Sequence, residues 1–82
     1  MKLTDAQIDA LLYDGKTIEM DGFVINSWFD DSTNEKNIEL IWQNPYREIG
    51  FIANGMTPSD LKKRLEMEIR GWEMARKDYS VF

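Results

Sequence analysis

The sequence contains neither cysteine nor histidine. Without cysteine, the chain has no disulfide framework and no thiolate chemistry. Without histidine, it lacks the commonest general base and the commonest metal ligand of proteins. A structural zinc site and catalysis by a Ser-His or Cys-His arrangement are therefore excluded. We expect a protein that is not an enzyme and that carries no cofactor and no metal.

Long apolar runs are also missing. No stretch approaches the length of a membrane-spanning helix, and the first residues do not contain the apolar segment of a signal peptide. A chain of 82 residues is the size of one small domain, and we expect a single domain over residues 1–82. These features predict a cytoplasmic protein that does not contact a membrane.

Basic residues are few in the first three quarters of the chain. Residues 1–59 contain ten acidic and four basic side chains, whereas residues 60–82 contain five acidic and six basic ones, and the formal net charge is −5. Such a charge is unfavourable for binding to nucleic acid. It is typical either of ordinary solubilising charge or of a surface that binds a basic partner.

The longest predicted element is a helix that starts at Thr57-Pro58. Thr57 is a suitable N-cap, Pro58 is suited to the first helical position, and Asp60 favours the positive end of the helix dipole. The apolar residues that follow recur at steps of three and four, which places them on one stripe of the helix. They are Leu61, Leu65, Ile69, Trp72, Ala75 and Tyr79.

A shorter helix is predicted near the N-terminus. Thr4 and Gln7 have the spacing of a capping box, and Asp14-Gly15 ends the pattern. Three further segments favour strands: residues 16–29, 38–43 and 46–53. The predicted fold is α+β, with a short N-terminal helix, an antiparallel sheet of three or four strands, and a long C-terminal helix on one sheet face. For the centre of the core we expect four aromatic residues: Trp28, Trp42, Phe51 and Trp72.

The number of strands depends on Asp21-Gly22. An Asp-Gly pair between two apolar runs is typical of a type I′ turn, which would give a hairpin of residues 16–20 and 23–29. Alternatively, Gly22 marks a bulge within one long strand.

Carboxylates are the only abundant reactive groups. The loop of residues 30–35 has oxygen ligands at alternating positions, but Glu35 and Ile41 occupy the positions where an EF-hand has glycine and glutamate, so a calcium site is not predicted. Fifteen carboxylates in one small domain make some close pairs inevitable. We interpret the loop as a solvated turn.

The chain also has one basic cluster, Lys62-Lys63-Arg64, at the start of the long helix. With the order helix, strands, helix, it resembles the double-stranded-RNA-binding domain, which has a lysine cluster at this place. The family's Lys-Lys-x-Ala-Lys corresponds to Lys62-Lys63-Arg64-Leu65-Glu66, with an acid at the last lysine, and its histidine-containing loop motif is absent. The resemblance implies contact of these three residues with phosphates.

A second face of the long helix is not accounted for by the core stripe. Met67, Gly71 and Met74 fall together on it. Methionine adapts to irregular partners and glycine permits close approach, so this face is a candidate contact surface for another protein or for a second copy in a homodimer. Glu68 lies near the apolar stripe, so it must find a partner, reach the rim of the core or be a contact residue.

In size, element order and acidity, the chain resembles small acidic inhibitors encoded by phages and mobile elements, including some anti-CRISPR proteins. The resemblance implies a DNA mimic whose carboxylates occupy the basic groove of a nucleic-acid-handling enzyme. We therefore predict a non-enzymatic protein-binding module, with direct binding of nucleic acid or a homodimeric regulatory subunit as alternatives. The candidate acidic contacts are Asp14, Glu19, Asp21, Asp30, Asp31, Glu35, Glu39 and Glu48.

Overall fold

A computed structural model describes residues 2–44 and 46–80, with side chains for residues 2–44 and 46–75. The predicted place of Tyr79 on the apolar stripe of the long helix lies outside the described side chains. The elements, in chain order, are α1 (Asp5–Tyr13), β1 (Ile18–Met20), β2 (Phe23–Asp30), β3 (Glu35–Gln43), β4 (Tyr46–Ile52) and α2 (Pro58–Ser80).

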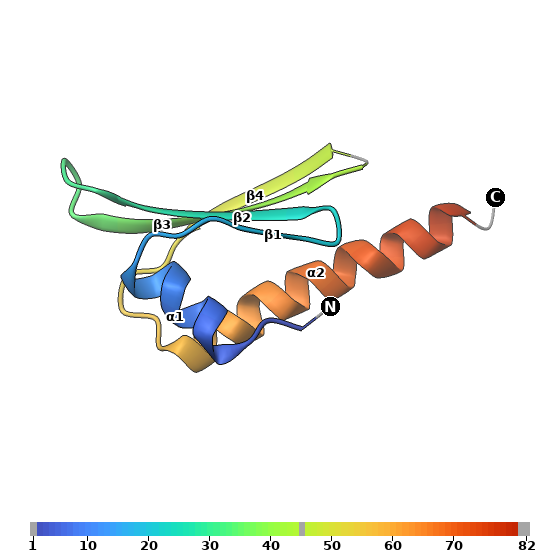
Figure 1. Cartoon of the computed structure of the whole chain (residues 1–82). Coiled ribbons are helices and arrows are strands. Elements are labelled where there is room, and N and C mark those ends of the chain that lie inside the picture. The colour runs from blue at the N-terminus through green and yellow to red at the C-terminus, as the bar shows by residue number, and fades with distance from the viewer. Residues whose placement is uncertain (1, 45, 81–82) are drawn as a thin grey trace.

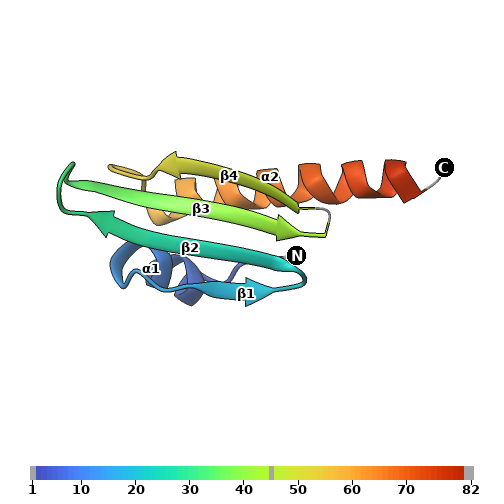
Figure 2. The same cartoon turned by 90° about the horizontal axis from the view of Figure 1, so that it is seen from above.

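The strands form one antiparallel sheet in the order β1-β2-β3-β4. Both helices lie against the same face of this sheet, and the other face is not covered by any described element (Figure 1). The α+β prediction is confirmed, with four strands. Viewed from above, α2 lies beneath the β4 side of the sheet and α1 beneath the β1 and β2 side (Figure 2).

The fourth strand arises from the turn at Asp21-Gly22. β1 pairs with β2 in a hairpin in which Met20 is opposite Phe23. Both turn residues have positive φ, 51° for Asp21 and 81° for Gly22, as a type I′ turn requires. The hairpin interpretation is therefore confirmed and the bulge interpretation is wrong.

Capping bonds fix where both helices begin. The Thr4 hydroxyl accepts a hydrogen bond from the Gln7 backbone N–H at 3.2 Å, and the Gln7 side chain accepts one from the Thr4 N–H at 2.9 Å. At α2, the Thr57 hydroxyl accepts a hydrogen bond from the Asp60 N–H at 3.2 Å. Each cap stabilises its helix by about 1 kcal/mol.

The core lies between the helices and the inner face of the sheet. Leu61, Leu65 and Ile69 of α2 are almost completely buried, as the stripe predicted. They pack with residues from α1 and from the two central strands. The members from these other elements include Ile8, Leu11, Ile25, Ile38, Leu40 and Trp42.

Three aromatic rings stack where α2 passes the start of β2 and the end of β3. The ring centroids of Phe23 and Trp42 are 5.3 Å apart, and those of Trp42 and Trp72 are 6.1 Å apart, with interplanar angles of 16° and 7°. Phe23 and Trp42 are buried, whereas Trp72 is partly buried. The stack attaches the middle of α2 to the sheet.

The prediction that Trp28 belongs to the core is wrong. Its side chain is 45% exposed. On β2 the buried residues are Phe23, Ile25 and Ser27, and because side chains alternate along a strand, Trp28 points to the opposite face. Phe51, by contrast, points to the inner face at the edge of the sheet and packs against the core.

A truncation of Trp72 tests the role of the stack. We expect Trp72→Ala to lower the free energy of unfolding by about 2–4 kcal/mol, at or below the usual range for tryptophan because the ring is only partly buried. Urea denaturation followed by circular dichroism measures the change. Trp28→Ala is the matched control and should cost about 1 kcal/mol or less. Equal losses in the two variants would contradict the assignment.

Candidate functional site

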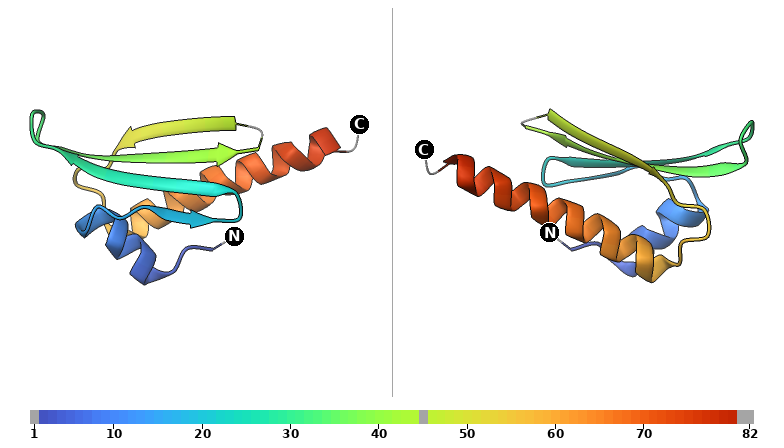
Figure 3. Two further views of the ribbon diagram at one scale, coloured as in Figure 1. Left: turned by 45° about the horizontal axis from the view of Figure 1, so that its top comes forward. Right: turned by 180° about the vertical axis from the view of Figure 1, so that it is seen from behind.

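The face of the sheet that neither helix covers is hereafter called the open face (Figure 3). Its residues follow from the alternation of side chains along each strand and from the strand register. They are Glu19, Val24, Asn26, Trp28, Asp30, Glu35, Asn37, Glu39, Ile41, Gln43, Tyr46, Glu48, Gly50 and Ile52.

The charges of the open face have one sign. Five of its strand residues are acidic, and among the described strand residues none that points to this face is basic. The two basic strand residues are Lys36 and Arg47. Each lies two positions before an isoleucine that faces the helices, Ile38 or Ile49, and so points to the helical side. The open face is therefore an acidic surface without internal neutralisation. The acidic members are Glu19, Asp30, Glu35, Glu39 and Glu48.

A line of hydrogen-bonded polar groups crosses this face. The Thr17 hydroxyl donates to Asn26 Oδ1 at 3.1 Å, and Asn26 Nδ2 donates to Glu39 Oε2 at 3.3 Å. The Tyr46 hydroxyl donates to Glu48 Oε2 at the other end. Between these two groups, Glu39 and Glu48 lie close enough to share a hydrogen bond. The line connects β2, β3 and β4, and the residue just before β1, through side chains.

The two glutamates titrate in opposite directions. The hydrogen bond with Glu48 raises the pKa of Glu39 above its usual value of 4.5. Hydrogen bonds from Tyr46 and from Glu39 lower the pKa of Glu48. The two carboxylates lie side by side, and the repulsion between them also raises the pKa of Glu39.

Apolar side chains lie beside these acids. Trp28, Asn37 and Ile52 stand opposite one another on three adjacent strands, and Trp28 and Ile52 are 45% and 53% exposed. Tyr46 is also largely exposed. Tyr46 and Ile52 were not among the predicted contact residues, and Trp28 was expected in the core. The alternation that places Glu39 and Glu48 on this face also assigns Trp28, Tyr46 and Ile52 to it.

Asp30 has a local structural role as well. Its Oδ1 accepts hydrogen bonds from the Ser32 hydroxyl at 2.6 Å and from the Ser32 N–H at 3.0 Å. These bonds lower the pKa of Asp30. The carboxylate therefore orders the loop between β2 and β3. Among the described residues, no group of three or more acidic side chains is arranged to hold a metal ion.

The remaining acidic candidates lie away from the open face. Asp21 is in the β1–β2 turn, Asp31 is at the tip of the β2–β3 loop, and Asp14 caps the end of α1 in the helical layer. All three are exposed. The structure therefore brings five of the eight predicted acids onto one surface and separates the other three from it.

The basic triplet is divided between two sides of α2. Lys62 Nζ lies 3.4 Å from Asp5 Oδ1, on the side of α1. Arg64 turns toward β4, where its guanidinium lies 4.9 Å from the centre of the Phe51 ring and its Nε lies 3.6 Å from Glu68 Oε1. Arg64 is thus the partner that Glu68 required. Direct nucleic-acid binding stays a prediction, without a continuous basic patch at this site.

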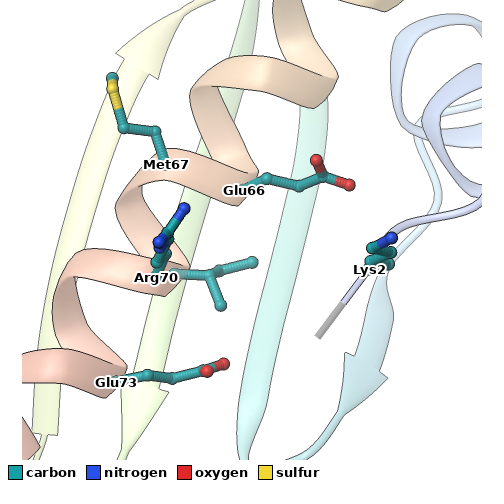
Figure 4. Close-up of a pocket in the computed structure, with 6 residues that line it drawn as sticks. Lys2, Glu66, Met67, Arg70 and Glu73 are labelled. Atoms are coloured by element: carbon teal, nitrogen blue, oxygen red, sulfur yellow. The ribbon is translucent and has the colours of Figure 1, made fainter.

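Met67, Gly71 and Met74 are exposed, as expected of residues outside the core stripe. A shallow hollow lies between α2 and the N-terminal segment; Met67 is one of its lining residues, and Figure 4 shows it with Lys2, Glu66 and Glu73. The Leu3 N–H donates to Glu66 Oε1 at 3.4 Å across this gap. The hollow contains mixed charges and no arrangement typical of catalysis.

Comparisons with known proteins do not assign this surface. A scan against protein-family models, a search of curated proteins and a search of solved structures all found no match. Within the described residues, no helix has both the length and the apolar character needed to cross a membrane. The geometry of the open face is therefore what indicates a function.

The titration of the two glutamates can be measured directly. We expect carbon-detected NMR to give a midpoint above 4.5 for Glu39 and below 4.5 for Glu48. In Glu48→Gln, the Glu39 midpoint should fall because the charged carboxylate that accepts its hydrogen bond and repels its ionised form is replaced by a neutral amide. In Glu19→Gln, which removes an acid elsewhere on the face, it should not change.

The sign of the effect on stability follows from these shifts. Glu39 binds its proton more firmly in the folded chain than in the unfolded chain. Its contribution to the free energy of unfolding is therefore full below pH 4.5 and is lost as the pH rises through its folded pKa. Glu48 contributes above pH 4.5, and this contribution is lost as the pH falls through its folded pKa. Identical midpoints for the two residues would contradict the opposite pKa shifts.

Proposed function

We propose that the chain is a non-enzymatic protein-binding module that uses the open face to bind a basic surface of another protein. The favoured partner is an enzyme that handles nucleic acid, and the favoured mechanism is occupation of its nucleic-acid groove. The observation that carries the proposal is the segregation of charge on the sheet. The open face has five carboxylates, and the basic strand residues Lys36 and Arg47 point the other way.

The arrangement of the acids supports a mimic of nucleic acid. Glu19, Glu39 and Glu48 are carried by three different strands, so their spacing is fixed by the sheet and not by flexible loops. A rigid array of negative charges complements a basic groove without the entropic cost of ordering a loop. Long-range attraction would also raise the association rate.

The apolar residues on the same face supply short-range binding energy. Trp28 and Tyr46 are of the types that dominate the energetics of protein interfaces, and both are exposed beside the acids. An aromatic side chain has nothing to pack against on a free cation, whereas it can fill a pocket in or beside the groove of a protein. The combination therefore favours a protein partner over a free cation.

Two variants of equal charge test the proposal. Partners captured from the native host by cross-linking to the intact chain would be identified, and the affinity of each would be measured against ionic strength. Glu19→Gln/Glu35→Gln should weaken binding about three- to tenfold at low salt, and the effect should shrink at high salt. Asp30 is left intact because its carboxylate orders the β2–β3 loop.

The control removes the same charge from the helical layer. Asp9 and Asp14 are exposed on the α1 side, so Asp9→Asn/Asp14→Asn should bind like the original chain. Duplex DNA should compete with the original chain for the partner. Binding that is insensitive to salt, or lost equally in both variants, would overturn the proposal, as would a gel shift of duplex DNA or RNA by the chain alone at micromolar concentration.

A further inference from the structure

The outer edge of β4 has no strand beside it. β4 is the last strand of the sheet, and it pairs only with β3. It is seven residues long, whereas the strand at the other edge, β1, has three. Figures 2 and 3 show no described element running alongside this edge. An edge of this length presents a row of backbone N–H and C=O groups that can pair with another strand.

We propose that a second copy of this chain occupies the edge. The two β4 strands pair antiparallel about a two-fold axis at Ile49, the central residue of the strand, and the two sheets become one sheet of eight strands. Opposite residues in such a pair point to the same side of the sheet. The register about Ile49 therefore places Tyr46 opposite Ile52, Arg47 opposite Phe51, and Glu48 opposite Gly50, each time from the other copy.

The pairs on the open face are complementary. Tyr46 and Ile52 are 67% and 53% exposed, and the register covers both by placing them opposite each other twice. An aromatic residue opposite a β-branched one is a favourable cross-strand pair, contributing about 0.2–1 kcal/mol. Gly50 has no side chain, so it leaves room for the Glu48 carboxylate that accepts the Tyr46 hydrogen bond.

The pairs on the helical side are complementary too. Ile49 and Phe51 are only partly buried at the edge of the core, and the second copy would cover them. Arg47 is exposed and would lie opposite the Phe51 ring of the other copy. A guanidinium near an aromatic ring is attracted to its face, as Arg64 already is within the chain.

Neighbouring registers lack this complementarity. An axis at Glu48 places the two Glu48 carboxylates opposite each other, and like charges directly opposite are destabilising. An axis at Gly50 places Glu48 opposite Ile52, and Tyr46 then has no residue of β4 opposite it. The register about Ile49 also uses the full length of the strand, so it makes the most backbone hydrogen bonds.

The position of α2 fits the same axis. Arg64 lies over Phe51, and α2 runs antiparallel to β4 beneath it (Figures 1 and 2). Ile49 is about 6.6 Å along the strand from Phe51, which corresponds to about four residues of helix and so to the segment between Met67 and Gly71. The two α2 helices would therefore meet antiparallel near Glu68. Gly71 lies within one turn of this point, and an added Cβ atom there would find no heavy atom within 4 Å outside the backbone of its own helix.

This dimer does not depend on the proposed function. It concerns the edge of the sheet, whereas the proposed function uses the open face as a whole; in the dimer Tyr46 is covered and Trp28 remains exposed for the partner. If both hold, the dimer presents two acidic faces as one continuous surface. Strand addition alone buries a modest area, so we expect a weak to moderate dimer.

Disulfide trapping tests the register. The chain has no cysteine, so an introduced cysteine can bridge only to another copy. Tyr46→Cys and Ile52→Cys, mixed and oxidised by glutathione, should give mainly the mixed disulfide, because opposite Cα atoms lie within bridging distance. Two Tyr46→Cys copies would be separated by about 20 Å. A statistical mixture of the three disulfides would overturn the register.

Sedimentation equilibrium tests the dimer itself. We expect association of the original chain that increases with concentration. Gly71→Arg should raise the dimer Kd at least tenfold without unfolding the chain, since arginine is a better helix former than glycine and the site is open. Ala6→Arg adds the same side chain to an exposed position of α1 and should leave the Kd unchanged. A monomer at concentrations up to about 1 mM would overturn the proposal.

Discussion

Both helices bury the same face of the sheet, and the remaining structure follows from this constraint. The central strands must supply two different surfaces from one sequence, with Ile25, Ile38 and Leu40 facing the helices and Asn26 and Glu39 facing water. Every residue that joins the core fixes the direction of its neighbours along the strand. The acidic surface is thus held in place by the hydrophobic one, because a slip of one residue would bury the acids and expose the core.

Much of the fold could be predicted from local signals. The caps at Thr4 and Thr57, the periodic stripe of α2 and the Asp21-Gly22 turn each depend on a few adjacent residues. The direction of Trp28 could not be read in the same way, because β2 is apolar at Phe23, Val24 and Ile25 and does not show which set of alternating residues is buried. The burial of Ser27 shows that the set Phe23, Ile25 and Ser27 faces the helices. Ser27 can be buried there because its hydroxyl donates a hydrogen bond to the Lys16 carbonyl oxygen at 3.2 Å.

The candidate site was less accessible to sequence reasoning than the fold. The acids could be named as a group, but their division into five on one face and three elsewhere required the register of four strands. The proximity of Glu39 and Glu48 required it too, because the two residues are nine positions apart and become diagonal neighbours only in the β3–β4 pair. The separation of Lys62 from Arg64 is visible only when Asp5 and Phe51 are in place.

The three tryptophans divide between the two sides of the sheet. Trp42 and Trp72 lie nearly parallel in the core stack, whereas Trp28 stands in solvent on the open face. The protein therefore has two separate optical reporters. Coupling between the stacked indoles responds to the docking of α2, and the emission of Trp28 responds to whatever covers the sheet. With Trp28 replaced, the remaining fluorescence would follow the integrity of the core, and the difference from the original chain would follow occupation of the open face.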